Sequence, residues 1–80
     1  MRVLLFTSEH CAPCRIAKQI VDEHYPEVEL LDISDMNNDR AAKLGNAYMV
    51  RQVPTLVVVD DEQDTAYVYG GVDQIRKSVD

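Results

Sequence analysis

The sequence predicts an α/β protein in which helices flank a mixed sheet of four strands. Three observations support this fold class. Apolar runs alternate with segments of helical periodicity, in the order strand, helix, strand, helix, strand, strand, helix. The first two strands are separated by a helix of about a dozen residues, the length that a parallel crossover needs. The last two are separated only by a short acidic turn, which is typical of an antiparallel hairpin.

The first half of the chain is predicted to contain a strand, a helix and a second strand. Residues 3–6 form a continuous apolar run, as expected of a buried central strand. Residues 12–24 follow with helical periodicity, and Pro13 is tolerated because it lies in the first turn. The side chains predicted to form the buried face of this helix are Ile16, Ala17, Ile20 and Val21. The helix ends at Tyr25–Pro26, and residues 27–33 form the second strand.

A shorter helix is predicted at residues 39–44. Residues 35–38 are rich in aspartate and asparagine, which favour the N-terminus of a helix. Gly45 is expected to cap the C-terminus, because glycine readily adopts the left-handed conformation found there. The side chains expected to face inward are Ala41, Leu44 and Tyr48.

The rest of the chain is predicted to form a hairpin and a last helix. Residues 55–59 are apolar and β-branched, and residues 66–69 are their partner strand. Residues 60–64 carry four acids but lack the glycine and the ligand spacing of a calcium loop, so they are interpreted as a solvated turn. Gly70–Gly71 is expected to end the hairpin, and residues 73–79 form the helix.

The composition limits the classes of function. The chain has 14 acidic and 8 basic residues, and its net charge of -6 opposes binding to nucleic acid or to an anionic membrane. The apolar run after Met1 is too short for a signal peptide or a membrane span. Two cysteines are too few for a small secreted disulfide scaffold. We therefore expect one domain over residues 1–80, working as a monomer in the cytoplasm with no metal.

The two cysteines, Cys11 and Cys14, are the centre of the predicted site. They lie where the first strand gives way to the first helix. The start of a helix offers unpaired N–H groups and a partial positive charge, which stabilise a thiolate. Helical residues three apart have Cβ atoms roughly 5–6 Å apart, so modest tightening lets two cysteines form a disulfide. The pair can therefore exist as a dithiol or as a disulfide.

Three interpretations of this pair are open. A structural zinc site usually needs four ligands, but the chain has no other cysteine and His24 lies at the far end of the helix. A structural disulfide that encloses two residues would restrain the unfolded chain very little. Redox chemistry is favoured, because the motif opens a helix after a strand in a chain expected to be cytoplasmic.

The element order, with Cys11-Ala12-Pro13-Cys14 after the first strand and Val53-Pro54-Thr55 before the third, resembles the thioredoxin–glutaredoxin superfamily. The resemblance covers essentially the whole chain. It implies a minimal thioredoxin fold and a thiol–disulfide oxidoreductase, a dithiol electron carrier that reduces protein disulfides. Gly70-Gly71-Val72-Asp73 resembles the Gly-Gly-x-Asp of glutaredoxins, whereas Pro54-Thr55-Leu56 is closer to thioredoxin.

The chain departs from these families at three positions near the cysteines. His10 stands where thioredoxins have a tryptophan before the first cysteine, and Leu5 stands where they have a buried acid. Ser8 stands where glutaredoxins often have a lysine that meets the glutathione carboxylate. Arg51 could supply that positive charge instead, or it could be an ordinary exposed loop arginine.

The resemblance implies roles for the motif residues. Cys11 attacks a substrate disulfide as a thiolate, and Cys14 then attacks Cys11 to release the reduced substrate. Helix N–H groups and Arg15 or protonated His10 would lower the pKa of Cys11, whereas Glu9 would oppose them. His10 would either relay a proton as well or be a plain surface histidine.

The opposite side of the site is implied to bind the substrate. The Val53–Pro54 bond is expected to be cis, with a trans strand-opening proline as the alternative. The Val53 backbone could then pair with an extended substrate segment. Gly70 and Gly71 would keep the facing wall low, and Asp73 is a helix N-cap candidate before it is a ligand contact.

No bound cofactor is expected. The reducing equivalents would come from NADPH through a thioredoxin reductase, or from glutathione. The alternatives to a general reductant of protein disulfides are a glutathione-dependent glutaredoxin and a dedicated electron donor to one enzyme, such as a ribonucleotide reductase.

Overall fold

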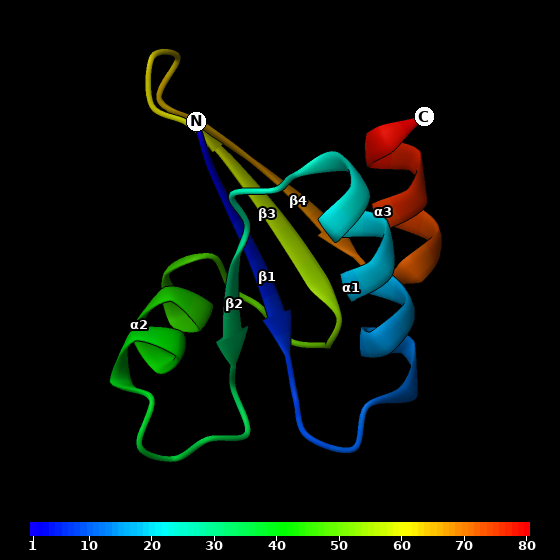
Figure 1. Cartoon of the computed structure of the whole chain (residues 1–80). Helices are drawn as coiled ribbons and strands as arrows, with labels where there is room; N and C mark the ends of the chain where they lie inside the picture. Colours follow the sequence, from blue (N-terminus) through cyan, green and yellow to red (C-terminus); the bar gives the residue numbers. More distant parts are fainter.

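Four strands form a single mixed sheet in the computed structural model, which describes residues 1–80 (Figure 1). The central strands are β1 (Arg2–Thr7) and β3 (Thr55–Asp60), and the edge strands are β2 (Glu29–Asp32) and β4 (Thr65–Gly70). The order is β2-β1-β3-β4, with β1 parallel to β2 and antiparallel to β3, and with β4 antiparallel to β3. This arrangement confirms the predicted fold class and element order.

Three helices cover the two faces of the sheet. The helices α1 (Ala12–His24) and α3 (Val72–Val79) lie together on one face, and α2 (Asp39–Ala47) lies on the other (Figure 1). Successive side chains of a strand point to opposite faces, so β1 and β3 contribute to both layers. None of the helices combines the length and the apolarity needed to cross a membrane.

Two apolar clusters form the core, one on each face of the sheet. The cluster beneath α1 and α3 contains Leu5, Ala17, Val21, Leu56, Val58 and Ile75. The cluster beneath α2 contains Leu4, Phe6, Leu31, Ala41, Val57 and Val59, with Leu44 and Tyr48 packed against it. The inward orientation expected for the α2 side chains is therefore confirmed.

The buried face of α1 differs from the predicted one. Ala17 and Val21 are buried and Ile20 packs against them, but Ile16 is 43% exposed, so its assignment to the core was wrong. Cys14 takes the core position instead, at 2% exposure. Cys14 and Ile16 are about 200° apart around the helix axis, so burying the cysteine turns the isoleucine outward.

The predicted end of α2 at Gly45 was also wrong. Gly45 is buried within the helix, which continues to Ala47. The N–H of Val50 donates to the carbonyl of Gly45 at 2.8 Å, and the N–H of Met49 donates to that of Asn46 at 3.2 Å. These two bonds form a Schellman motif, in which Met49 takes the left-handed position with φ 56°.

Several strand boundaries differ from the predicted ones by one or two residues, including the start of β2 and the end of β4. β2 begins at Glu29 rather than at residue 27, because the N–H of Val28 donates to the carbonyl of Tyr25 in the preceding turn. β4 includes Gly70, which pairs with Thr55, so the hairpin extends one residue beyond its expected end.

Candidate active site

The cysteine pair lies at the N-terminus of α1. Cys11 is the N-cap residue, with φ -107° and ψ 101°, and Cys14 lies in the first helical turn. The two residues form a disulfide with a Cα–Cα distance of 5.2 Å. Cys11 is partly exposed whereas Cys14 is buried, so a second molecule can reach only the first sulfur.

The helix start can stabilise a negative charge on Cys11. The N–H of Cys14 donates to the Cys11 Sγ at 3.2 Å, and the first turn of α1 contains no acidic residue. A side chain at the N-cap meets the unpaired N–H groups and the positive end of the helix dipole. The position therefore suits a thiolate nucleophile.

A shallow groove of about 500 Å³ lies beside the pair. It is lined by Pro13 and Ile16 of α1, by Val53 and Pro54, and by the Gly70–Asp73 segment. The Val53–Pro54 peptide bond is cis, as expected. The N–H of Gly71 donates to the carbonyl of Pro54 at 2.8 Å, which joins two walls of the groove.

Val53 has polar groups free to meet a ligand. Neither its N–H nor its carbonyl takes part in any hydrogen bond within the chain. The neighbouring Gln52 carbonyl, in contrast, accepts from the Thr55 hydroxyl at 2.7 Å. The groove therefore offers one backbone donor and one backbone acceptor next to the cysteine pair.

The Gly70–Asp73 segment differs from the expectation in one respect. The N-cap of α3 is Gly71, with φ 88° and ψ 162°, and no side chain caps this helix. Asp73 was therefore wrongly expected at the N-cap, because α3 begins one residue earlier, at Val72. Asp73 lies in the first turn of α3, where the helix dipole stabilises a negative charge. It also lines the groove.

Three of the predicted side chains do not line the groove. Arg51 lines a separate hollow on the other side of Gly70, together with Met49, Gln52 and Gln74. His10 has a left-handed backbone with φ 62°, and its side chain is 90% exposed, with Glu9 as its charged neighbour at 3.8 Å. Arg15 is exposed on α1. The structure therefore brings together Cys11, Cys14 and the Val53, Pro54 and Gly70–Asp73 set.

Ile16 and Gln52 lie at the site although neither was predicted there. Ile16 extends the apolar floor of the groove, and its position follows from helical spacing once Cys14 is taken as buried. Gln52 lies against Gly70 so closely that a Cβ atom there would collide with the Gln52 amide. No local pattern in the sequence indicates that contact.

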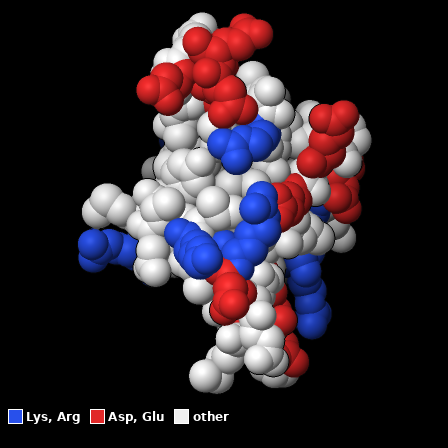
Figure 2. Space-filling model, turned by 90° about the vertical axis from the view of Figure 1, so that its left-hand side faces the viewer, with Lys and Arg blue, Asp and Glu red and all other residues white.

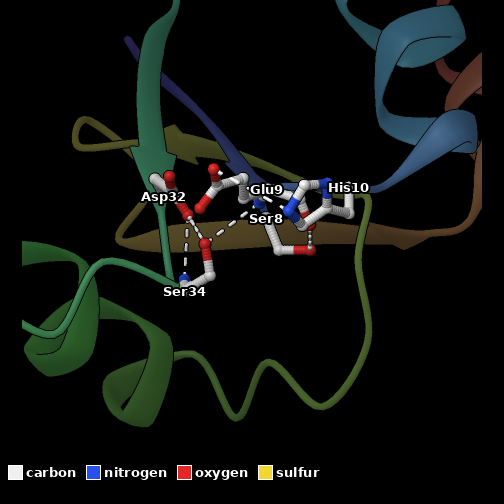
Figure 3. Close-up of polar contacts among 5 residues, drawn as sticks. All are labelled: Ser8, Glu9, His10, Asp32 and Ser34. Atoms are coloured by element: carbon white, nitrogen blue, oxygen red, sulfur yellow. Dashed lines mark hydrogen bonds and ion pairs between the residues drawn. The ribbon is translucent and has the colours of Figure 1, made fainter.

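A hydrogen-bonded cluster anchors the loop before Cys11 (Figure 3). Asp32 accepts from both the N–H and the hydroxyl of Ser34, and Ser34 in turn accepts from the N–H of Glu9. The hydrogen bond from the Ser34 hydroxyl is the main reason why the pKa of Asp32 lies below its ordinary value, and the bond from the Ser34 N–H lowers it further. Neither Asp32 nor Ser34 was singled out from the sequence.

One group of acidic residues lies away from the groove. The β3–β4 turn carries Asp60, Asp61, Glu62 and Asp64, and acidic side chains cluster at that end of the molecule in Figure 2. The strand register places this turn beside Arg2, whereas the cysteines follow the opposite end of β1. No group of three or more His, Cys, Asp or Glu side chains is placed to hold a metal ion.

Comparison with known families gives one clear match. The family model described as Thioredoxin matches residues 1–80. The chain is 32% identical over 65 residues to the thioredoxin of Chlamydia pneumoniae, a match that covers 81% of this chain and 64% of the relative. It is 29% identical over 68 residues to thioredoxin 1 of a Nostoc species, covering 84% and 64% of the two chains. The chain thus spans a little under two thirds of the length of these relatives.

Solved structures show the same fold. Oxidized thioredoxin O2 from Arabidopsis thaliana superposes with a TM-score of 0.65 at 28% identity, over 98% of this chain and 70% of that one. A thioredoxin from Malassezia sympodialis superposes with a TM-score of 0.65 at 16% identity, over 96% and 68% of the two chains. The likeness at such low identity reflects the shared fold alone.

Proposed function

The chain belongs to the thioredoxin family, and on this basis we propose that it is a thiol–disulfide oxidoreductase that reduces protein disulfides. The observation that carries the proposal is the placement of the cysteine pair. Cys11 is a partly exposed N-cap and Cys14 is buried one turn further along the helix. This arrangement separates an attacking thiol from a resolving one.

The reaction proceeds in two exchange steps. In the reduced protein, the Cys11 thiolate attacks one sulfur of a substrate disulfide, the substrate S–S bond breaks, and the other substrate sulfur leaves as a thiolate. Cys14 then loses its proton and attacks the Cys11 sulfur. The mixed disulfide breaks, the second substrate sulfur leaves and is protonated, and the Cys11–Cys14 disulfide forms. Two electrons have passed from the protein dithiol to the substrate.

The groove supports an extended peptide as the substrate. The unpaired N–H and carbonyl of Val53 can form the two hydrogen bonds that an added strand requires. Ile16, Pro13 and Val72 provide apolar contacts on either side. Asp73 is the one charged side chain in the groove, so recognition rests mainly on backbone and apolar surface.

A thioredoxin reductase is the proposed electron donor, with NADPH as the source. Two observations favour it over glutathione. Arg51, the arginine that could have met a glutathione carboxylate, lines a hollow separate from the groove. Ser8, where glutaredoxins often have a lysine, supplies no positive charge. We propose that the reaction takes place in the cytoplasm, because thiols are kept reduced there and a cysteine pair that forms a disulfide is usually catalytic.

The donor and the activity are tested together by insulin reduction with two electron sources in parallel. NADPH with thioredoxin reductase is compared with NADPH, glutathione and glutathione reductase, and NADPH consumption is followed. We expect turnover with the first source alone, and none with the Cys11→Ser variant. Turnover with glutathione alone would contradict the proposed donor. Inactivity with both would contradict a general reductant and favour a dedicated partner enzyme.

A further inference from the structure

The loop between β1 and the cysteine pair is held at one point by the segment that follows β2. The N–H of Ile33 donates to the carbonyl of Thr7 at 2.9 Å, which extends the β1–β2 pairing by one bond. One residue further on, the Ser34 Oγ accepts from the N–H of Glu9 at 3.0 Å. In Figure 3, Glu9 lies between Ser34 on one side and His10 on the other.

Asp32 sets the direction of this bond. Its Oδ1 accepts from the Ser34 N–H at 2.9 Å and from the Ser34 hydroxyl at 2.5 Å. A serine hydroxyl has one proton to donate, and here the proton points at the carboxylate. The lone pairs of the Ser34 oxygen are therefore left for the Glu9 N–H. A charged acceptor also polarises the hydroxyl and strengthens the bond that the hydroxyl accepts.

The hydrogen bond between the Glu9 N–H and the Ser34 hydroxyl, called the tether below, lies only two residues before Cys11. Between Glu9 and Cys11 lies His10, whose φ of 62° is a conformation that costs an L-residue about 1–2 kcal/mol. Beyond His10, Cys11 is fixed to the helix by the Cys14 N–H. The unfavourable backbone of His10 is thus held between two anchors. If the Glu9 anchor is lost, His10 can relax and move the Cys11 sulfur.

We propose that Ser34 and Asp32 are positioning residues for Cys11, which hold the loop so that the Cys11 sulfur is presented at the helix N-terminus beside the groove. This proposal rests on the proposed function of Cys11 as the attacking thiol. The tether is exposed, so water can replace it and the fold as a whole gains little from it. Its effect is therefore concentrated on the reactivity of one cysteine.

The test compares four variants of the reduced protein. Ser34→Ala removes the tether without changing charge, and Ser34→Thr keeps the hydroxyl. Asp32→Ala removes the group that orients Ser34. Asp35→Ala is the matched control, because it removes a carboxylate from the same turn whose bond goes only to the Asn37 N–H. The rate of alkylation of Cys11 by iodoacetamide is measured across pH, together with urea unfolding and hydrogen exchange of the Glu9 amide.

We expect Ser34→Ala and Asp32→Ala to slow alkylation of Cys11 at neutral pH by about two- to tenfold, the factor implied by the loss of one hydrogen bond. Turnover with insulin should fall by a similar factor. The urea midpoint should fall by no more than the loss of one exposed hydrogen bond allows. Glu9 exchange should accelerate, and Ser34→Thr and Asp35→Ala should react like the original protein. A wild-type alkylation rate in Ser34→Ala despite faster Glu9 exchange would overturn the proposal. So would a Ser34→Thr variant as slow as Ser34→Ala.

Separate measurements test the positioning of Cys11 by Ser34 and the proposed reduction of protein disulfides. If the unmodified protein does not reduce insulin, the function fails. The ratio of alkylation rates still decides whether the tether positions Cys11, because alkylation needs no disulfide substrate.

Discussion

Alanine at two glycines is predicted to shift the stability in opposite directions. Gly45 lies inside α2, and a Cβ atom there would meet Phe6 Cε1 at 3.8 Å, an ordinary contact. Alanine is about 0.8–1.0 kcal/mol more favourable than glycine in a helix interior. Gly71 combines φ 88° with ψ 162°, a region essentially restricted to glycine, although nothing lies within 4 Å of the added carbon. Alanine there costs about 1–3 kcal/mol through the backbone alone.

The two variants are compared by thermal unfolding of the oxidised protein. Circular dichroism is the suitable probe, because the chain has no tryptophan. For a domain of this size, a change of 1 kcal/mol moves Tm by about 4–8 °C. Gly45→Ala should therefore raise Tm by about 3–8 °C, and Gly71→Ala should lower it by about 4–24 °C.

Each variant can refute one part of this reasoning. A lower Tm for Gly45→Ala would mean that Gly45 needs a left-handed backbone, as a helix that ended there would require. An unchanged Tm for Gly71→Ala would mean that the turn between β4 and α3 is not held in the conformation that restricts it to glycine. Because both substitutions add the same methyl group, neither result can be ascribed to hydrophobicity.

Two further predictions concern the surface. Met49→Gly should raise the free energy of unfolding by about 0.5–1 kcal/mol, because glycine removes the cost of a left-handed L-residue at the end of α2. The exposed control Met36→Gly should not raise it. Equal urea midpoints for the two variants would contradict this prediction. The hydrogen bond from Arg40 holds the pKa of Glu29 below its ordinary value of 4.5, so the pair stabilises the fold above that pH and the contribution is lost as pH falls through the lowered pKa. The stability difference between the original protein and Arg40→Ala should be small for so exposed a pair and should shrink from about pH 6 to about pH 3. A constant difference would contradict the assignment.

The fold was predictable because its signals are local. The apolar runs of β1 and β3 and the helical spacing of α1 each follow from a few adjacent residues. The errors arose where a long-range contact decides the outcome. Gly45 was assigned to a cap because glycine is common there, yet it lies inside the helix against Phe6 of β1, and α2 continues to Ala47.

The chemistry of the site was predictable for the same reason, and its supports were not. Cys11 and Cys14 are three residues apart, and Val53–Pro54 matches a family motif. The bond from Glu9 to Ser34, in contrast, joins residues 25 apart in sequence. Serine and aspartate after a strand are common turn residues, and only the spatial pairing of β1 with β2 brings them to the loop that carries the nucleophile.

The roles of the two cysteines are tested most directly by the mass of the adducts that Cys14→Ser and Cys11→Ser form with a peptide disulfide. We predict a stable mixed disulfide on Cys11 in Cys14→Ser, because the resolving thiol is missing. We predict almost none in Cys11→Ser, because Cys14 is only 2% exposed. An adduct of equal yield on Cys14 in Cys11→Ser, or no adduct in either variant, would contradict the assignment of Cys11 as the attacking thiol.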